Sequence, residues 1–226
     1  MKNILYLLIS IAFYSSSTYA VGGTVGNGGF VITCATTTNY LSLDYVLAKE
    51  FFAADTKIQT ATNLEESLYR IADIIDQKMP SLSKSFLEFI NNLNNESDDS
   101  KPYFWNSNYF GLSYETDDQA ISQIPFSCEG IRRSGGWLKQ VVIREMIEKG
   151  NGQKQIVFEF DQNLLHSLPP LQASFIYVHE WLWNLSTDVQ QNRKINYFLH
   201  SDQPARLTAE QVQKQMKTFG VDLTQR

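Results

Sequence analysis

The central pattern of this 226-residue chain is LPPLQASFIYVHEWLWNLSTDVQQNRKINYFLHS, residues 168–201. It predicts two successive helices, the first after Pro169-Pro170 and the second from about Asp188 to His200. In the first helix, apolar residues recur at a four-three-four-three spacing, which is typical of a helix face that packs on a core. This stripe consists of Leu171, Phe175, Val178, Leu182 and Leu185.

The first of these helices contains half of a zinc-hydrolase motif. His179-Glu180 has the spacing of the first two residues of HExxH, in which two histidines bind zinc and the glutamate acts as a general base. The position of the second histidine is occupied by Trp183. A zinc site would therefore need His179 with His200 and Asp188, or His166, as further ligands and Glu180 as the base. The alternative is that His179 is a buried neutral side chain, hydrogen-bonded within the fold.

The second helix has an unusual line of polar side chains. Asp188, Asn192, Asn196 and His200 are spaced by four residues, so they follow one slowly rotating line beside apolar positions. Buried amides must be hydrogen-bonded, because an unsatisfied polar group costs about 1–3 kcal/mol. Arg193 can pair with Glu180 or Asp188. Both a structural polar network and a catalytic or ligand site predict that one shared set of side chains converges: His179, Glu180, Asp188, Asn192 and Arg193.

The clearest β signal precedes this stretch, at about residues 138–160. VVIREMIEK and KQIVFEF flank Gly150-Asn151-Gly152, which supplies the positive-φ residues of a tight hairpin. A helix is expected at roughly 42–53, and a second should begin at the N-cap Asn63 with Glu66 three residues later. A third should have an apolar face, and the last should run from the cap Thr208 to Gly220. The face of the third consists of Leu82, Phe86, Phe89, Ile90 and Leu93.

This order of elements predicts an α+β fold, with helices around a small antiparallel sheet, and a single domain at residues 21–226. The domain is expected to follow a signal peptide at residues 1–20. Lys2 gives the positive n-region, Ile4–Tyr14 is an apolar stretch too short to span a membrane, and cleavage is expected after Ala20. The mature chain should therefore be exported, periplasmic or secreted, and no later stretch is apolar enough for a transmembrane span.

Composition limits the partners and the chemistry. The net charge of −5 argues against nucleic acid, whose phosphates require a basic face. In an oxidising compartment, the two cysteines favour a Cys34–Cys128 disulfide; the alternative is a pair of buried thiols. The composition identifies no partner and no certain cofactor, with zinc as the one candidate.

Residues 168–201 are also similar to a block in a family of uncharacterised exported proteins of predatory Gram-negative bacteria and their relatives. Two shorter segments share this resemblance, the glycine segment Gly26-Asn27-Gly28-Gly29 and the Leu43-Asp44-Tyr45 triplet. The family has an acidic residue after GNGG, where this chain has Phe30. The resemblance implies the compartment and gives no mechanism.

Three functions compete at this stage. The first is a non-enzymatic envelope or secreted protein, in which the polar cluster is structural or binds a partner. The second is a metal-dependent hydrolase with zinc on His179 and Glu180 as base; the missing second histidine favours the first. The third is a glycan- or peptide-binding module that uses the aromatic residues between Tyr103 and Tyr114, whose alternative role is to pack over the sheet.

Overall fold

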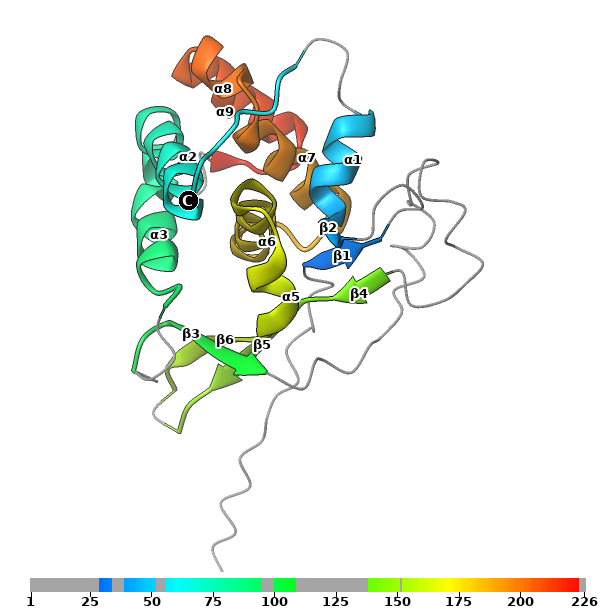
Figure 1. Ribbon diagram of the computed structural model, residues 1–226. Helices are drawn as coiled ribbons and strands as arrows, with labels where there is room; N and C mark the ends of the chain where they lie inside the picture. The colour runs from blue at the N-terminus through cyan, green and yellow to red at the C-terminus, as the bar shows by residue number, and fades with distance from the viewer. Residues whose placement is uncertain are drawn as a thin grey trace, which may run out of the picture.

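Helices form most of the described protein, and two short sheets lie beside them (Figure 1). The computed structural model describes residues 29–33, 39–51, 56–94, 100–108, 138–150 and 152–223. The helices are α1 (Leu43–Phe51), α2 (Leu64–Lys78), α3 (Pro80–Asn91), α5 (Gln162–Ser167), α6 (Pro170–Leu182), α7 (Val189–His200), α8 (Gln203–Arg206) and α9 (Ala209–Thr218). The strands are β1 (Phe30–Ile32), β2 (Leu41–Ser42), β3 (Tyr103–Asn108), β4 (Leu138–Gln140), β5 (Val142–Glu148) and β6 (Lys154–Asp161). The predicted α+β class is confirmed.

Helix α6 is the centre of the fold. Its neighbours are α2, α7, α1 and β2, and Figure 1 shows it enclosed between the other helices and the sheets. Every residue from Gln172 to Leu182 is buried, so the helix has no solvent-facing side along this length. The single apolar face predicted from the sequence was therefore too narrow, and Leu171, at its start, is only partly buried. A helix surrounded by neighbours buries its polar residues too, and these must find partners inside the protein.

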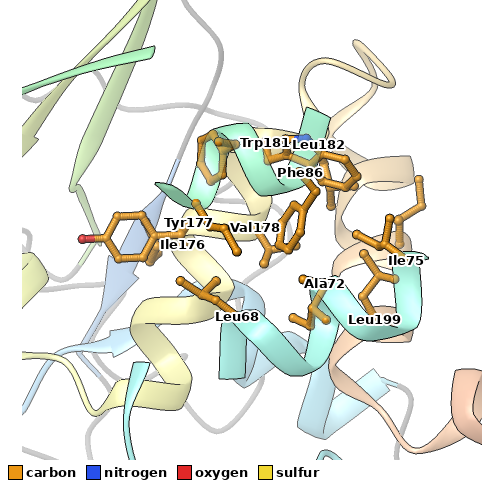
Figure 2. Close-up of a cluster of buried hydrophobic side chains, with 14 of the residues drawn as sticks. Leu68, Ala72, Ile75, Phe86, Ile176, Tyr177, Val178, Trp181, Leu182 and Leu199 are labelled. Atoms are coloured by element: carbon orange, nitrogen blue, oxygen red, sulfur yellow. The ribbon is translucent and has the colours of Figure 1, made fainter. Parts of the chain in front are cut away.

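The main core lies between α6 and the α2–α3 pair. Figure 2 shows Leu68, Ala72 and Ile75 of α2 facing Ile176 and Val178 of α6. Phe86 of α3 contacts Trp181 of α6 edge-on, with ring centroids 4.7 Å apart. Each fully buried large side chain of this kind contributes about 1.5–3 kcal/mol through apolar burial. This packing fixes α6 along its whole length.

The strands form two sheets instead of the one small sheet that was expected. β1 lies between β2 and β4 in an antiparallel sheet, with Val31 opposite Ser42 and Lys139. β6 lies between β3 and β5 in a mixed sheet. The predicted hairpin is present as β5 and β6, antiparallel with Val142 opposite Phe160. Residues 138–140, expected to belong to the hairpin, pair with β1, because Val141 turns the chain from one sheet to the other and its amide donates to Gly29 O at 2.7 Å.

Local signals in the sequence placed the ends of several elements correctly. The Asn63 side chain accepts a hydrogen bond from the Glu66 amide at 2.7 Å and caps α2. Thr208 and Gln211 form the predicted capping box of α9, and Gly220 follows that helix with φ +90°. In the hairpin turn, Gly152 has φ +76°, the conformation for which a glycine was expected.

The aromatic residues at the start of the 103–114 stretch pack inside the protein. Trp105 stacks on Phe158 with ring centroids 4.3 Å apart, and both contact Phe89 of α3. Tyr103 and Trp105 are buried, so they do not form the surface row that the glycan-binding hypothesis required. Residues 109–114 lie outside the described residues, as do the predicted signal peptide with Ala20 and the predicted Cys34–Cys128 disulfide.

We expect Gly220→Ala to lower the free energy of unfolding by about 1–2 kcal/mol, because an L side chain at positive φ is strained. A Cβ at this position would also come within 2.7 Å of the Gln191 side chain. Gly150→Ala is the matched control, since its Cβ would meet nothing within 4 Å. Urea unfolding followed by tryptophan fluorescence measures both variants, and equal losses would contradict the role of the Gly220 conformation.

Candidate functional site

The site is organised around the carboxylate of Asp44, in the first turn of α1. Its Oδ2 accepts hydrogen bonds from His179 Nδ1 at 2.7 Å and from Asn196 Nδ2 at 2.9 Å. Its Oδ1 accepts from Arg193 Nε at 3.0 Å. We call these four residues, Asp44, His179, Arg193 and Asn196, the Asp44 network. They join α1 to α6 and α7 through side chains that are far apart in the sequence.

The network is closed to solvent. Asp44 is 8% exposed, Arg193 7%, His179 2% and Asn196 0%. Burial by itself would raise the pKa of Asp44, but the charges and hydrogen bonds of His179, Arg193 and Asn196 outweigh it and hold that pKa well below its usual range. Asp44 is therefore ionised throughout the physiological range, and its oxygens act only as acceptors. The Nδ1 atom of His179 must carry the proton in this pair.

His179 and Glu180 have opposite surroundings although they are adjacent in α6. Burial disfavours the charged form of His179, but Asp44 and Glu180 raise its pKa above the ordinary value. Burial raises the pKa of Glu180 to about 7, although His179, the Gly29 amide and Arg144 all act to lower it. Glu180 therefore titrates near neutral pH, and the protonated form of His179 is favoured more than in a free histidine. Arg144 itself donates a hydrogen bond to Asn184 Oδ1 at 2.8 Å.

Glu180 connects α6 to the first described strand. Its Oε1 accepts a hydrogen bond from the Gly29 amide at 2.7 Å, just before β1. Glycine is required here because a Cβ would lie 2.6 Å from Ile176 Cγ2. In the described structure, Glu180 Oε2, His179 Nε2 and Asn196 Oδ1 are buried atoms without a hydrogen-bond partner. Of these, Glu180 Oε2 and His179 Nε2 belong to groups that can exchange a proton.

His200 belongs to a separate polar cluster, one turn further along α7 than Asn196. Its Nδ1 donates to Asn196 O at 2.9 Å, and its Nε2 lies 2.8 Å from Ser174 Oγ, which in turn contacts Ser67 Oγ at 2.8 Å. The imidazole stacks on the Phe175 ring, with centroids 3.8 Å apart. Burial lowers the pKa of His200 to about 3, so the ring is neutral. Both of its nitrogens are already used within the fold.

The structure brings together only part of the predicted cluster. His179, Arg193 and Asn196 meet at Asp44, and Arg193 pairs with this residue instead of Glu180 or Asp188. Asp188 is the N-cap of α7, where its Oδ1 accepts from the Gln190 amide at 2.7 Å.

Asn192 fixes the same end of α7 by donating to Ser186 O at 3.2 Å. His166 lies at the end of α5, with its ring 6.2 Å from that of Phe160. The proposed zinc ligands His179, His200 and Asp188 are thus not gathered around one point. In the part of the chain that the structure describes, no three His, Cys, Asp or Glu side chains are grouped as metal ligands.

Asp44 is the residue that sequence reasoning missed. An acidic side chain in the first turn of a helix ordinarily faces solvent and interacts favourably with the positive end of the helix dipole. This ordinary role was enough to explain an aspartate at position 44. The available signal was its apolar neighbourhood, since Leu43 and Leu47 of the same helix are buried. The buried side-chain amides of α7 and the buried His179 of α6 together require a hydrogen-bond acceptor from a third element. Asp44 of α1 supplies it.

We expect Asp44→Asn to lower the free energy of unfolding by about 3 kcal/mol or more. The change removes the charge that compensates buried Arg193 and places an NH₂ group among donors. Asp188→Asn is the matched control, because asparagine caps a helix as well as aspartate, and the loss should stay within about 0.5 kcal/mol. Equal urea midpoints for the two variants would contradict the central role of Asp44.

Glu180 also predicts a pH dependence. Its pKa is about 7 in the folded protein and near its ordinary value of 4.5 when unfolded, so its burial costs stability increasingly as pH rises between these values. The stability of Glu180→Gln relative to wild type should therefore increase from pH 5 to pH 8. His200 titrates in both proteins and cancels in this difference to first order, whereas His179 is coupled to Glu180 by charge and its titration is part of the difference. Urea unfolding at each pH measures it, with Glu65→Gln, at an exposed position, as the control; a flat difference for Glu180→Gln would refute the assignment.

Comparison with known proteins gives no assignment for this arrangement. No family model, no curated protein and no solved structure matches the chain. The resemblance to exported proteins of predatory bacteria thus stays a prediction from the sequence. Any functional conclusion must come from the geometry of the Asp44 network and its surroundings.

Proposed function

We propose that this chain is an exported, non-enzymatic protein of the cell envelope or the secreted fraction, in which the Asp44 network has a structural role. The observation that supports this most directly is the engagement of both oxygens of the Asp44 carboxylate by three donors from two helices. A buried carboxylate with this many partners fixes the positions of the elements that supply them.

Burial supports the structural role over a catalytic one. A group that reacts with a substrate must be reached by it, whereas His179 is 2% exposed and Glu180 is 0% exposed. The Asp44–His179 and Asp44–Arg193 contacts join residues 135 and 149 positions apart in the sequence. Interactions of this range hold together parts of a chain that local signals cannot align.

The export part of the proposal is supported by the sequence of residues 1–20, with Lys2 in the n-region, the short apolar stretch Ile4–Tyr14 and Ala20 before the expected cleavage point. Among the described helices, none has the length and apolar character needed to span a membrane.

A metal-dependent hydrolase is the second candidate, and one observation favours it. His179 Nε2 and Glu180 Oε2 are unpartnered in the described structure, and the pKa of Glu180 is about 7, which suits a general base. The donor set does not fit zinc, however. Protein zinc sites need three or four ligands, but His200 is hydrogen-bonded at both nitrogens and Asp188 caps α7 on the exposed side.

One preparation tests the proposal against the hydrolase. The full-length chain is expressed in a Gram-negative host, and the protein recovered from the periplasm should begin at Val21. After incubation with one equivalent of Zn²⁺ and dialysis, elemental analysis should find much less than one zinc per chain in the wild type. Glu180→Gln should fold, since glutamine also accepts the Gly29 hydrogen bond, and should have the same metal content.

Two results would overturn the proposal. The first is one zinc per chain that is retained by Glu180→Gln and lost in His179→Gln, which would establish a zinc site on His179. The second is recovery of the chain in the cytoplasm with residues 1–20 still attached, which would contradict export. Circular dichroism of each variant confirms that a change in metal content is not caused by unfolding.

A further inference from the structure

A small cavity lies beside the Asp44 network, between α1, residues 56–60, the start of α6 and α7. Its volume is about 380 Å³, within the range of small-molecule sites and near its lower limit. The wall is mostly apolar and includes Tyr45, Ala48, Ile58, Leu171 and Tyr197. These residues belong to a hydrophobic cluster that is separate from the main core, with Phe175 at its base. We call this cavity the α1–α7 pocket.

The walls of the α1–α7 pocket are fixed before any ligand binds. Residues 56–60 are attached to the end of α7 by a β-bridge between Ile58 and Ser201. Backbone hydrogen bonds of 2.9 Å lie on both sides of it, from Gln59 N to His200 O and from Asp202 N to Lys57 O. A preformed pocket loses little conformational entropy on binding, which favours affinity for a small ligand.

The opposite wall is equally well held. The ring of Tyr45 packs edge-on against Phe175 with centroids 5.7 Å apart, and Phe175 stacks on His200. Two wall residues, Tyr45 and Tyr197, directly follow Asp44 and Asn196 in the sequence, and these two residues belong to the Asp44 network. This wall is thus fixed from behind by buried polar contacts.

Two lysines are among the described residues that line the pocket, although the chain as a whole has a net charge of −5. Lys49 and Lys57 line it and are exposed, and the Lys49 ammonium lies 5.4 Å from the centre of the Tyr45 ring. Neither lysine has an ion-pair partner in the described structure. The nearby acid, Asp202, accepts from the Lys57 amide at 3.3 Å and is itself paired with Arg206.

None of the described residues that line the pocket carries a negative charge. Burial raises the pKa of Tyr197, although its hydrogen bond with Thr56 acts to lower it, so the phenol is neutral at physiological pH. The described lining thus consists of two aromatic rings, aliphatic groups, two threonines and two lysine ammonium groups. This combination is complementary to a molecule with an apolar body and one anionic group.

We propose that the α1–α7 pocket binds a small organic anion. This anion is an aromatic carboxylate with one or two rings, or a branched aliphatic carboxylate of similar size. The apolar body lies against Tyr45, Leu171 and Tyr197, and the carboxylate lies at the mouth between Lys49 and Lys57. Neither His179 nor Glu180 takes part, so this site is independent of the role assigned to the Asp44 network.

The test compares 1-naphthoate with its uncharged isostere 1-naphthamide by isothermal titration calorimetry on the mature protein. Naphthoate should bind about three- to tenfold more tightly, the difference expected for two solvent-exposed charge contacts. In the Lys49→Gln/Lys57→Gln variant this preference should disappear while naphthamide binds as before. Lys194→Gln, an exposed lysine of α7 outside the pocket, is the matched control and should keep the wild-type preference.

A second variant tests the position of the body. Leu171→Trp fills the pocket from a partly exposed wall residue and should abolish binding of both molecules, with an unchanged thermal midpoint. Amide chemical shifts should respond at Lys57, Ile58 and Ala48. The proposal is overturned if the wild type shows no saturable binding of naphthoate. It is also overturned if acid and amide bind equally, or if the preference survives loss of both lysines.

Discussion

The whole arrangement depends on keeping one ionised carboxylate, that of Asp44, inside the protein. A buried charge is tolerated only where hydrogen bonds replace its lost hydration, and here His179, Arg193 and Asn196 together do so. These donors project from α6 and α7, so the carboxylate sets how α1 lies on both helices. Both the first antiparallel sheet, through β2 next to α1, and the α1–α7 pocket depend on that placement.

Much of the local structure could be predicted, because its signals act over three or four residues. The Asn63 cap, the Thr208 and Gln211 capping box and the Gly152 turn each depend on contacts within one turn of chain. Two parts of the candidate site could be predicted as well. The polar line on α7 required partners, and His179 was recognised as a buried candidate. The sequence thus indicated where polar groups would be buried.

What could not be predicted lies in pairings between distant segments. The parallel contact of β3 with β6 and the pairing of β4 with β1 depend on where the helices place each strand. In the candidate site, the role of Asp44 could not be predicted for the same reason, because its partners follow it by 135 residues or more. The zinc hypothesis treated His200 and Asp188 as neighbours of His179 on spacing alone. In the structure, His200 instead contacts Ser174, and Asp188 caps the start of α7.

The distance along the chain between Asp44 and its partners also governs the order in which the molecule can be completed. Helix α1 leaves the ribosome long before α6 and α7 exist, and until they arrive its carboxylate stays hydrated. Contacts of such long range are the slowest to form, because a large loop must close first. A growing chain of this design cannot complete the Asp44 network until its last third has been synthesised. Until then α1 has no fixed place on α6 and α7, so the docking of this early helix is a late, post-synthetic step of folding.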